Sequence, residues 1–172
     1  MLKAVIFDFG HTIIDELKDS DIPLKQRPIS LMPGLPDTLS QINLDMGIWA
    51  NTRQVREPGV RLWLRRAGIN SYFRWVVTSA DAGVRKPEAQ FFSYALRKCG
   101  MKSKEILFVG NQLNTDIKGA NDYGIRCVWL SGVAYRSPDD DPAFLGRVKP
   151  THVVESLKQL PSLVKSLGSA VD

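Results

Sequence analysis

Short apolar runs along this chain alternate with segments in which apolar residues recur at helical spacing. The runs lie at residues 3–8, 48–50, 75–78, 106–109 and 125–130, with a short sixth at 153–154. An apolar run of this length between turn residues is typical of a strand buried in a parallel sheet. The alternation predicts βαβ units, and therefore an α/β fold with a mainly parallel central sheet.

Helical periodicity occupies most of the intervening sequence. Apolar residues share one helical face over residues 35–46, 60–67 and 92–99, and glycines that can end these helices follow at Gly47, Gly68 and Gly100. Asn114 can cap a short helix that reaches residue 123. A last amphipathic segment covers residues 157–167, with Pro161 at a helix-start position.

Two stretches, residues 16–32 and 131–150, show neither period and are predicted to be loops. Neither reaches the roughly 50 residues that an independent domain needs, so we expect a single domain over residues 1–172. No apolar run is long enough to cross a bilayer, and Met1 leads directly into the first strand. We therefore expect a cytoplasmic location, with Cys99 and Cys127 reduced in the core.

The positive charge is concentrated in one part of the chain. Residues 53–86 hold eight basic side chains against two acidic ones, a net charge of +6, so the rest of the chain carries −1 of the total of +5. Such a block can attract an anionic ligand or a nucleic acid. It can equally be the solvated face of a helix, because Arg61, Arg65 and Arg66 fall on the polar side of a predicted helix. Nucleic-acid binding is disfavoured but stays open.

Polar side chains follow three of the predicted strands. Asp8, Asn51 and Asn111 stand at strand ends, where ligands of open α/β sheets bind. Lys86 precedes Pro87 at the entrance to a predicted helix, where free N–H groups favour anions. With Asp116, these residues supply carboxylate, amide and ammonium groups, which together predict a phosphate and magnesium site.

Four segments, FDFGHTIID, IWANT, GVRKPEAQFF and VGNQLNTDIKGA, resemble in this order the four motifs of the haloacid dehalogenase superfamily of phosphohydrolases. The segment PGLPDTL and the pair Gly119–Ala120 also resemble this family. The resemblance implies a Rossmann-like three-layer α/β/α fold. No sizeable cap domain is expected, because no long insertion separates the motifs.

The resemblance also implies roles for individual residues. Asp8 matches the nucleophile that becomes an aspartyl phosphate, and Lys86 matches the lysine that neutralises it and the transferred phosphoryl group. The expected magnesium ligands are Asp8, the carbonyl of Gly10, Asn111 and Asp116. The residues expected around the phosphate are Thr12, Asn51, Thr52 and Lys86. This chemistry is covalent catalysis with electrostatic stabilisation.

Three positions depart from the family pattern. Gly10 stands where family phosphatases usually carry the aspartate that protonates the leaving group, a role worth about 10² to 10⁴ in rate. Ala50 replaces the Ser or Thr of the second motif, and Asn111 replaces the first acid of the fourth. Fewer carboxylates predict weaker magnesium binding. His11, beside the vacant position, could serve as the acid or could be a bystander of the turn.

These observations favour a magnesium-dependent phosphohydrolase acting through Asp8 on a phosphorylated small molecule or macromolecule, with an open site that a second copy of the chain could cover. The alternative is a weak or inactive relative that binds a phosphorylated ligand or a protein partner. Removal of halide from a haloacid shares the nucleophile, but it needs a closed apolar pocket, against which the missing cap argues. Neither the substrate nor the oligomeric state follows from the sequence.

Overall fold

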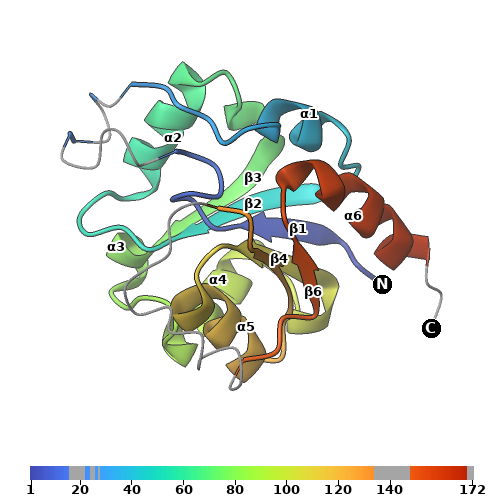
Figure 1. Cartoon of the computed structure of the whole chain (residues 1–172). Coiled ribbons are helices and arrows are strands. Elements are labelled where there is room, and N and C mark those ends of the chain that lie inside the picture. Colours follow the sequence, from blue (N-terminus) through green and yellow to red (C-terminus); the bar gives the residue numbers. More distant parts are fainter. Residues whose placement is uncertain (16–21, 24–25, 27, 134–147, 170–172) are drawn as a thin grey trace.

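Six parallel strands form one sheet, in the order β3-β2-β1-β4-β5-β6, in the part of the chain that the computed structural model describes, residues 1–15, 22–23, 26, 28–133 and 148–169 (Figure 1). The strands are β1 (Ala4–Phe7), β2 (Asp45–Ala50), β3 (Phe73–Thr78), β4 (Ile106–Gly110), β5 (Arg126–Leu130) and β6 (His152–Val154). The chain leaves β1 toward one edge and returns through β4 toward the other, so β1 and β4 flank the switch point. The α/β prediction is confirmed.

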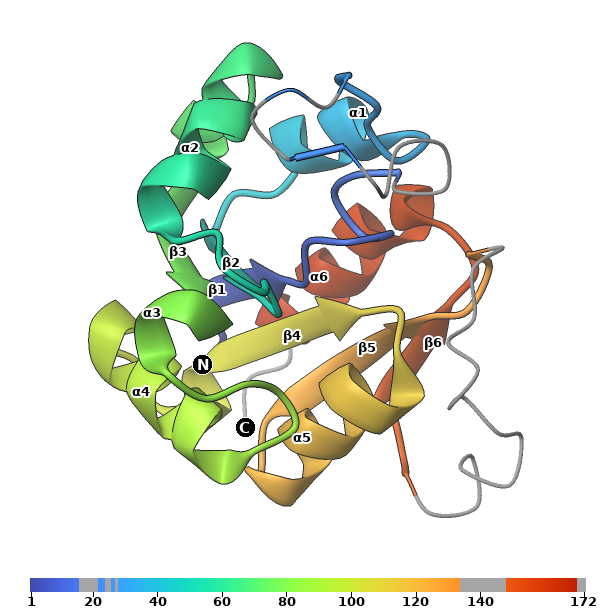
Figure 2. The same cartoon turned by 90° about the vertical axis from the view of Figure 1, so that its left-hand side faces the viewer.

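Helices cover both faces of the sheet. They are α1 (Leu35–Ser40), α2 (Glu57–Arg66), α3 (Ser79–Ala82), α4 (Ala89–Cys99), α5 (Lys118–Asp122) and α6 (Leu160–Ser169), with short turns η1 (Asn70–Tyr72), η2 (Ser103–Glu105), η3 (Leu113–Ile117) and η5 (Leu157–Gln159). Figures 1 and 2 show α1, α2 and α6 on one side of the sheet and α4 and α5 on the other. This is the three-layer α/β/α arrangement that the family resemblance implies.

The two faces of β1 build two separate cores. Val5 and Phe7 pack in the layer beneath α1, α2 and α6, whereas Ala4 and Ile6 pack in the layer above α4 and α5. All four side chains are fully buried. A strand that is covered on both faces holds its backbone rigidly, and the residue that follows it is therefore well positioned.

The predicted helix over residues 35–46 is wrong in its second half. The helix ends at Ser40, and β2 begins at Asp45, whose backbone pairs with Ala4 of the central strand. Ladder bonds and burial in the sheet outweigh the helical spacing of the apolar residues. Gly47 does not end a helix: it lies inside β2, where a Cβ atom would come within 2.9 Å of Ile6 Cδ1.

The predicted cap at Asn114 is also wrong. Gln112 occupies the cap position, and its carbonyl accepts hydrogen bonds from Asp116 N at 3.0 Å and Ile117 N at 3.2 Å. These bonds wind residues 113–117 into one wide π turn that continues into α5. The remaining predicted strands and helices agree with the structure within a few residues, and Gly68, Gly100 and Gly124 have the positive φ expected after helices.

Both cysteines are buried free thiols, as predicted, and burial raises the pKa of Cys99 to about 11. None of the helices in the described part of the chain has the length and apolar character of a membrane span. The two predicted loops fall largely outside the described residues. At the edge of the first, Leu31 forms a single antiparallel bridge with Ile14.

Candidate active site

The carboxyl ends of three adjacent strands bring predicted site residues to one edge of the sheet. Asp8 follows β1, Asn51 follows β2, and Asn111 follows β4. Two more predicted residues reach the same edge from longer connections, Lys86 from the segment between α3 and α4 and Asp116 from the π turn after β4. Sequence positions far apart therefore meet where β1 and β4 end.

Lys86 lies at the centre of this edge and joins two carboxylates. Its ammonium donates to Asp8 Oδ1 at 2.6 Å and to Asp116 Oδ1 at 2.8 Å. Its third hydrogen bond goes to the carbonyl of Trp49 at 2.9 Å. An ammonium has three donors, so all are used in a side chain that is only 1% exposed. We call Asp8, Lys86 and Asp116 the Lys86 cluster.

Asn51 fixes the segment that carries Lys86. Its amide nitrogen donates to the carbonyl of Lys86 at 3.0 Å, and its amide oxygen accepts from the backbone N–H of Lys86 at 2.9 Å. This pair of bonds ties the end of β2 to a residue 35 positions away. Asn51, for which the sequence predicts phosphate binding, here has a clear positioning contact with the backbone of Lys86.

The Lys86 cluster has two carboxylates and one ammonium, and this imbalance together with burial shifts the pKa values of its members. Burial, followed by the charge of Asp116, raises the pKa of Asp8 to about 7, although Lys86 and a backbone hydrogen bond at Phe9 oppose the rise. Burial alone would lower the pKa of Lys86, but Asp116 and Asp8 outweigh it and the net shift is upward. Lys86 is therefore charged at neutral pH, while Asp8 is held near its titration point.

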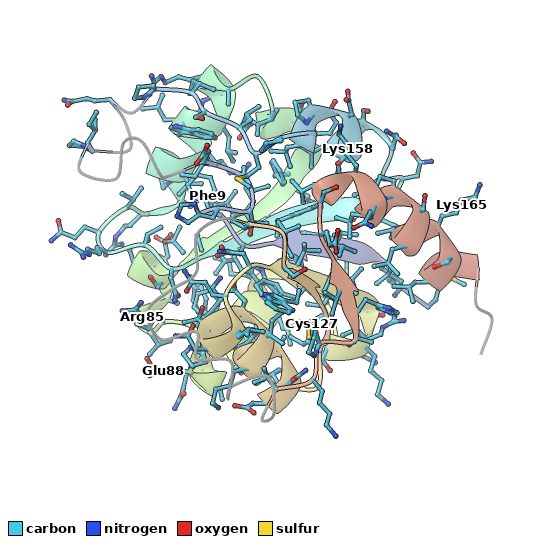
Figure 3. The ribbon with its side chains drawn as sticks, in the orientation of Figure 1. Phe9, Arg85, Glu88, Cys127, Lys158 and Lys165 are labelled. Carbon is cyan, nitrogen blue, oxygen red and sulfur yellow. The ribbon has the colours of Figure 1, made fainter. Side chains whose placement is uncertain are left out.

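A tight turn follows Asp8, and a hydrogen bond joins it to the end of β4. His11 N donates to Ile14 O at 2.7 Å, and His11 has φ 55°, a left-handed conformation that few residues adopt. The turn buries Thr12, whose hydroxyl donates to Asn111 Oδ1 at 3.3 Å. Phe9, labelled in Figure 3, packs edge-on against Trp63 of α2, with ring centroids 5.6 Å apart. The turn is thus anchored on both sides.

The donor set is chemically suited to Mg²⁺. Within the described residues no group of three or more His, Cys, Asp and Glu gathers, but Mg²⁺ commonly uses one or two carboxylates together with waters. Asp8 and Asp116 supply two carboxylates against one ammonium, and a divalent cation would offset the remaining charge. Asn111 has its amide oxygen on Thr12 and a buried amide nitrogen with no hydrogen-bond partner in the described part of the chain.

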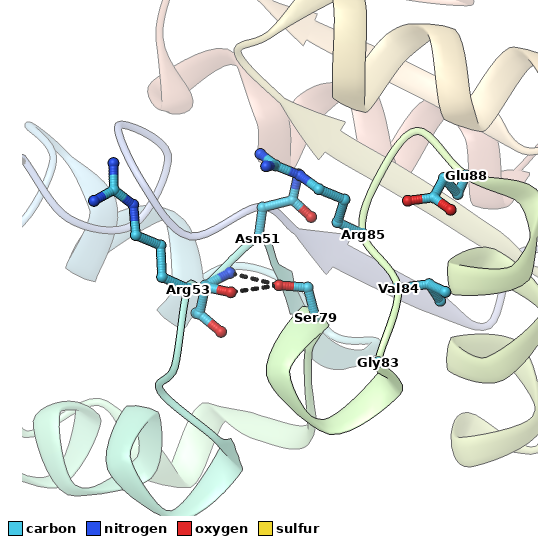
Figure 4. Close-up of a pocket in the computed structure, with 8 residues that line it drawn as sticks. Asn51, Arg53, Ser79, Gly83, Val84, Arg85 and Glu88 are labelled. Carbon is cyan, nitrogen blue, oxygen red and sulfur yellow. Dashed lines mark hydrogen bonds between the residues drawn. The ribbon is translucent and has the colours of Figure 1, made fainter.

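A pocket of about 570 Å³ (Figure 4) adjoins the segment that carries Lys86, because Asn51, which binds the Lys86 backbone, and Arg85 both line it. Its lining residues are Asn51, Thr52, Arg53, Ser79, Gly83, Val84, Arg85 and Glu88. The hydroxyl of Ser79 donates to Thr52 O at 2.6 Å and accepts from Thr52 N at 2.9 Å, which are the dashed lines in Figure 4. The hydroxyl of Thr52 donates to Val55 O. Ser79 was not a predicted site residue, and only its place after a strand could have indicated it.

Comparison with known proteins gives a consistent result. Residues 83–160 match the family model described as HAD-hydrolase-like. A glyceraldehyde 3-phosphate phosphatase from Methanocaldococcus jannaschii is 33% identical over 97% of this chain and 71% of its own length. The pyrimidine 5′-nucleotidase YjjG from Escherichia coli is 31% identical over 77% of this chain, which spans 56% of that enzyme.

Solved structures share the fold over nearly the whole chain. A structure of an uncharacterized protein from Listeria monocytogenes serotype 4b has a TM-score of 0.80 at 26% identity and covers 97% of this chain and 99% of that one. The putative HAD-hydrolase YfnB from Bacillus subtilis, solved bound to magnesium, has a TM-score of 0.73 at 18% identity, covering 95% and 98% of the two chains. At 18% identity, the similarity to YfnB shows a shared fold and no more.

Proposed function

Because the chain belongs to the haloacid dehalogenase-like hydrolases, we propose that it is a phosphatase in which Asp8 accepts the phosphoryl group. One observation carries the proposal: Lys86 is buried between Asp8 and Asp116 at the end of the central strand. Three bonds hold an ammonium where a negatively charged group would react. A structural ion pair at the surface would need neither this burial nor this place in the sheet.

In the proposed reaction an oxygen of Asp8 attacks the phosphorus of a monoester, and the bond between phosphorus and the leaving oxygen breaks. Lys86 keeps the carboxylate of Asp8 in place and offsets negative charge as the phosphoryl group approaches. Bound Mg²⁺, held by Asp8, the Gly10 carbonyl, Asn111 and Asp116, would neutralise charge on the phosphoryl oxygens and favour ionised Asp8. Thr12, Asn51, Thr52 and Lys86 are the proposed surroundings of the phosphate.

The leaving oxygen departs with the electron pair of the broken bond and needs a proton unless it is a stable anion. Gly10 has no side chain to supply that proton, so the site is suited to esters with good leaving groups. His11 is the nearest titratable residue along the turn and is 5% exposed. Water then hydrolyses the aspartyl phosphate, a step that Gly10 also leaves without its usual base.

The substrate class follows from the relatives. Those named above act by name on glyceraldehyde 3-phosphate and on pyrimidine 5′-nucleotides, and a third, from Halopiger xanaduensis, is a ribulose-1,5-bisphosphate 5-phosphatase. We therefore favour a phosphorylated small molecule over a macromolecule. The proposal includes one core domain over residues 1–172 without a cap, a site that a second copy could cover, and a cytoplasmic location.

The second candidate is a protein that binds a phosphorylated ligand and turns it over slowly or not at all. Gly10 and Asn111 favour it, because both remove carboxylates that the family uses at these positions. The Lys86 cluster is needed under both candidates, so only turnover separates them.

The deciding experiment is hydrolysis of 4-nitrophenyl phosphate by the purified protein, with and without Mg²⁺. This ester makes little demand on a missing acid. Activity that requires Mg²⁺ and disappears in Asp8→Asn would support the phosphatase. Activity that persists in Asp8→Asn would point to a contaminant and count against it, and absence of activity would favour the second candidate.

A further inference from the structure

Some arginines of the basic block, residues 53–86, have side-chain hydrogen-bond or ion-pair partners among the described residues of the structure, and others do not. Arg61 donates to Glu57 at 2.8 Å and to the carbonyls of Phe73 and Arg74 at 3.1 Å. Arg74 pairs with Asp45 at 2.7 Å, and its guanidinium lies 4.9 Å from the ring of Trp75. These two side chains have structural partners around β3 and are accounted for without any ligand.

Arg53 and Arg85 differ from them. Both side chains are exposed, and no hydrogen bond or ion pair joins either guanidinium to another residue of the described part of the chain. They come from separate connections, one after β2 and the other after α3, yet both line the same pocket as Asn51. Figure 4 shows the two guanidinium groups extending to the same side of the pocket, away from Gly83.

The pocket is built onto the candidate active site. Asn51 lines it and also holds the backbone of Lys86, whose side chain contacts Asp8. Arg85 directly precedes Lys86, and Arg53 follows the Thr52 backbone that Ser79 clamps. A ligand with its phosphoryl group at Asp8 and its remaining atoms in this pocket would therefore lie beside these two arginines. Among the described lining residues Glu88 is the one acidic side chain, so together they carry an excess of one positive charge.

We infer that the pocket selects phosphate esters that carry a second anionic group, a carboxylate or a second phosphate, bound by Arg53 and Arg85. The inference rests on the proposed function, since it takes the transferred phosphoryl group to lie at Asp8. Guanidinium groups pair with carboxylate and phosphate oxygens through parallel hydrogen bonds. A neutral or apolar tail would leave both unpaired charges facing it.

The test uses three non-hydrolysable phosphonates that share a three-carbon skeleton: propylphosphonate, 3-phosphonopropanoate and propane-1,3-bisphosphonate. Their affinities for the full chain with Mg²⁺ are measured by calorimetry. We expect one or both two-anion compounds to bind about tenfold more tightly than propylphosphonate. A preference for the carboxylate or for the bisphosphonate identifies the second group.

Arg53→Gln and Arg85→Gln should each remove most of that preference while weakening propylphosphonate binding much less. Glu88→Gln should increase the preference. The matched control is Arg65→Gln, because Arg65 is exposed near the end of α2 and outside the pocket, and it removes the same charge. If Arg65→Gln lost the preference for the two-anion compounds to the same extent, the preference would come from the overall positive charge of the protein, and the inference would be overturned.

Hydrolysis of 4-nitrophenyl phosphate, measured in parallel, distinguishes failure of the proposed phosphatase function from failure of the proposed selection for a second anionic group. If hydrolysis depends on Asp8 but all three phosphonates bind equally, the inference is overturned and the proposed function stands. If the protein neither hydrolyses the ester nor binds any phosphonate, the proposed function fails and the inference fails with it.

Discussion

Asp116 packs directly against Gly110, the last residue of β4. A Cβ atom at Gly110 would lie 2.5 Å from Oδ2 of Asp116 and 2.6 Å from its Cβ, closer than such atoms approach one another in proteins. The same Oδ2 accepts a hydrogen bond from Gln112 N at 3.1 Å, while Oδ1 holds Lys86. Because Gly110 has no side chain, the carboxylate of Asp116 has room to lie in the position from which it binds Lys86.

Gly110→Ala should displace Asp116 and break its contact with Lys86. Overpacking of this kind typically costs about 1 to 3 kcal/mol in the free energy of unfolding, and we expect phosphatase activity to fall more than tenfold. Urea denaturation and 4-nitrophenyl phosphate hydrolysis measure the two effects. Gly168→Ala in α6 is the matched control, because a Cβ atom there meets nothing within 4 Å. Equal behaviour of the two variants would show that Asp116 tolerates the displacement.

Asp8→Asn should stabilise the metal-free protein at neutral and alkaline pH. The folded state raises the pKa of Asp8 from 3.8 to about 7, so the stability associated with the neutral acid is complete below about pH 4 and is lost as the pH rises through 7. Each unit of pKa corresponds to about 1.4 kcal/mol, and we expect a gain of at least that size near pH 8 and a smaller one near pH 5.

Urea denaturation in EDTA at the two pH values measures this difference. Asp37→Asn removes the same charge at an exposed position of α1 and should show no comparable increase with pH. A gain in Asp8→Asn that is equal at both pH values would mean that ionisation of Asp8 is not what destabilises the metal-free protein.

Gly10→Asp should restore the missing acid and base. For an alkyl phosphate, whose leaving group needs a proton, we expect turnover to rise by about 10² to 10⁴, and for 4-nitrophenyl phosphate much less. The ratio of kcat values for the two esters is the readout, because a general change in folding would alter both alike. A ratio equal to that of the native protein would mean that another residue, with His11 the nearest candidate, already performs this step.

Asn111→Asp should tighten Mg²⁺ binding and destabilise the protein without Mg²⁺. It keeps an oxygen for the hydroxyl of Thr12 but adds a third carboxylate to a buried site with one ammonium. In EDTA we expect Tm to fall by a few degrees, which corresponds to a loss of roughly 1 to 2 kcal/mol in the free energy of unfolding. The rise in Tm on adding Mg²⁺ should be larger than in the native protein. Asn43→Asp, an exposed site before β2, should change neither quantity.

Much of the fold could be predicted because period and turn chemistry agree over most of the chain. The error after Ser40 arose because Ile42 and Met46 continue the helical face of Leu35 and Leu39 by coincidence. Only pairing with β1, a contact between distant residues, shows that Met46 belongs to a strand. The wide turn at residues 113–117 depends instead on two local bonds to Gln112 O, and the apolar spacing does not distinguish such a π turn from an α-helical one.

For the candidate site, strand ends and motif order were enough to bring Asp8, Lys86 and Asp116 to one edge, but not to predict the contacts of Asn51. The contacts of Asn51 with the Lys86 backbone depend on the path of a connection 35 residues away, which no local pattern encodes. That Arg53 and Arg85, which come from separate connections, line one pocket was likewise not predictable from the sequence.

The Lys86 cluster has a consequence for how the molecule folds. Lys86 lies 78 residues from Asp8 and 30 from Asp116 along the chain, and Thr12 lies 99 from Asn111. Contacts of such separation form only after long loops have closed, which is slow compared with the formation of helices. After dilution from denaturant, recovery of the reactive centre should therefore lag behind recovery of secondary structure, and a nascent chain should stay inactive until the turn after β4, which carries Asp116, has formed its contact with Lys86.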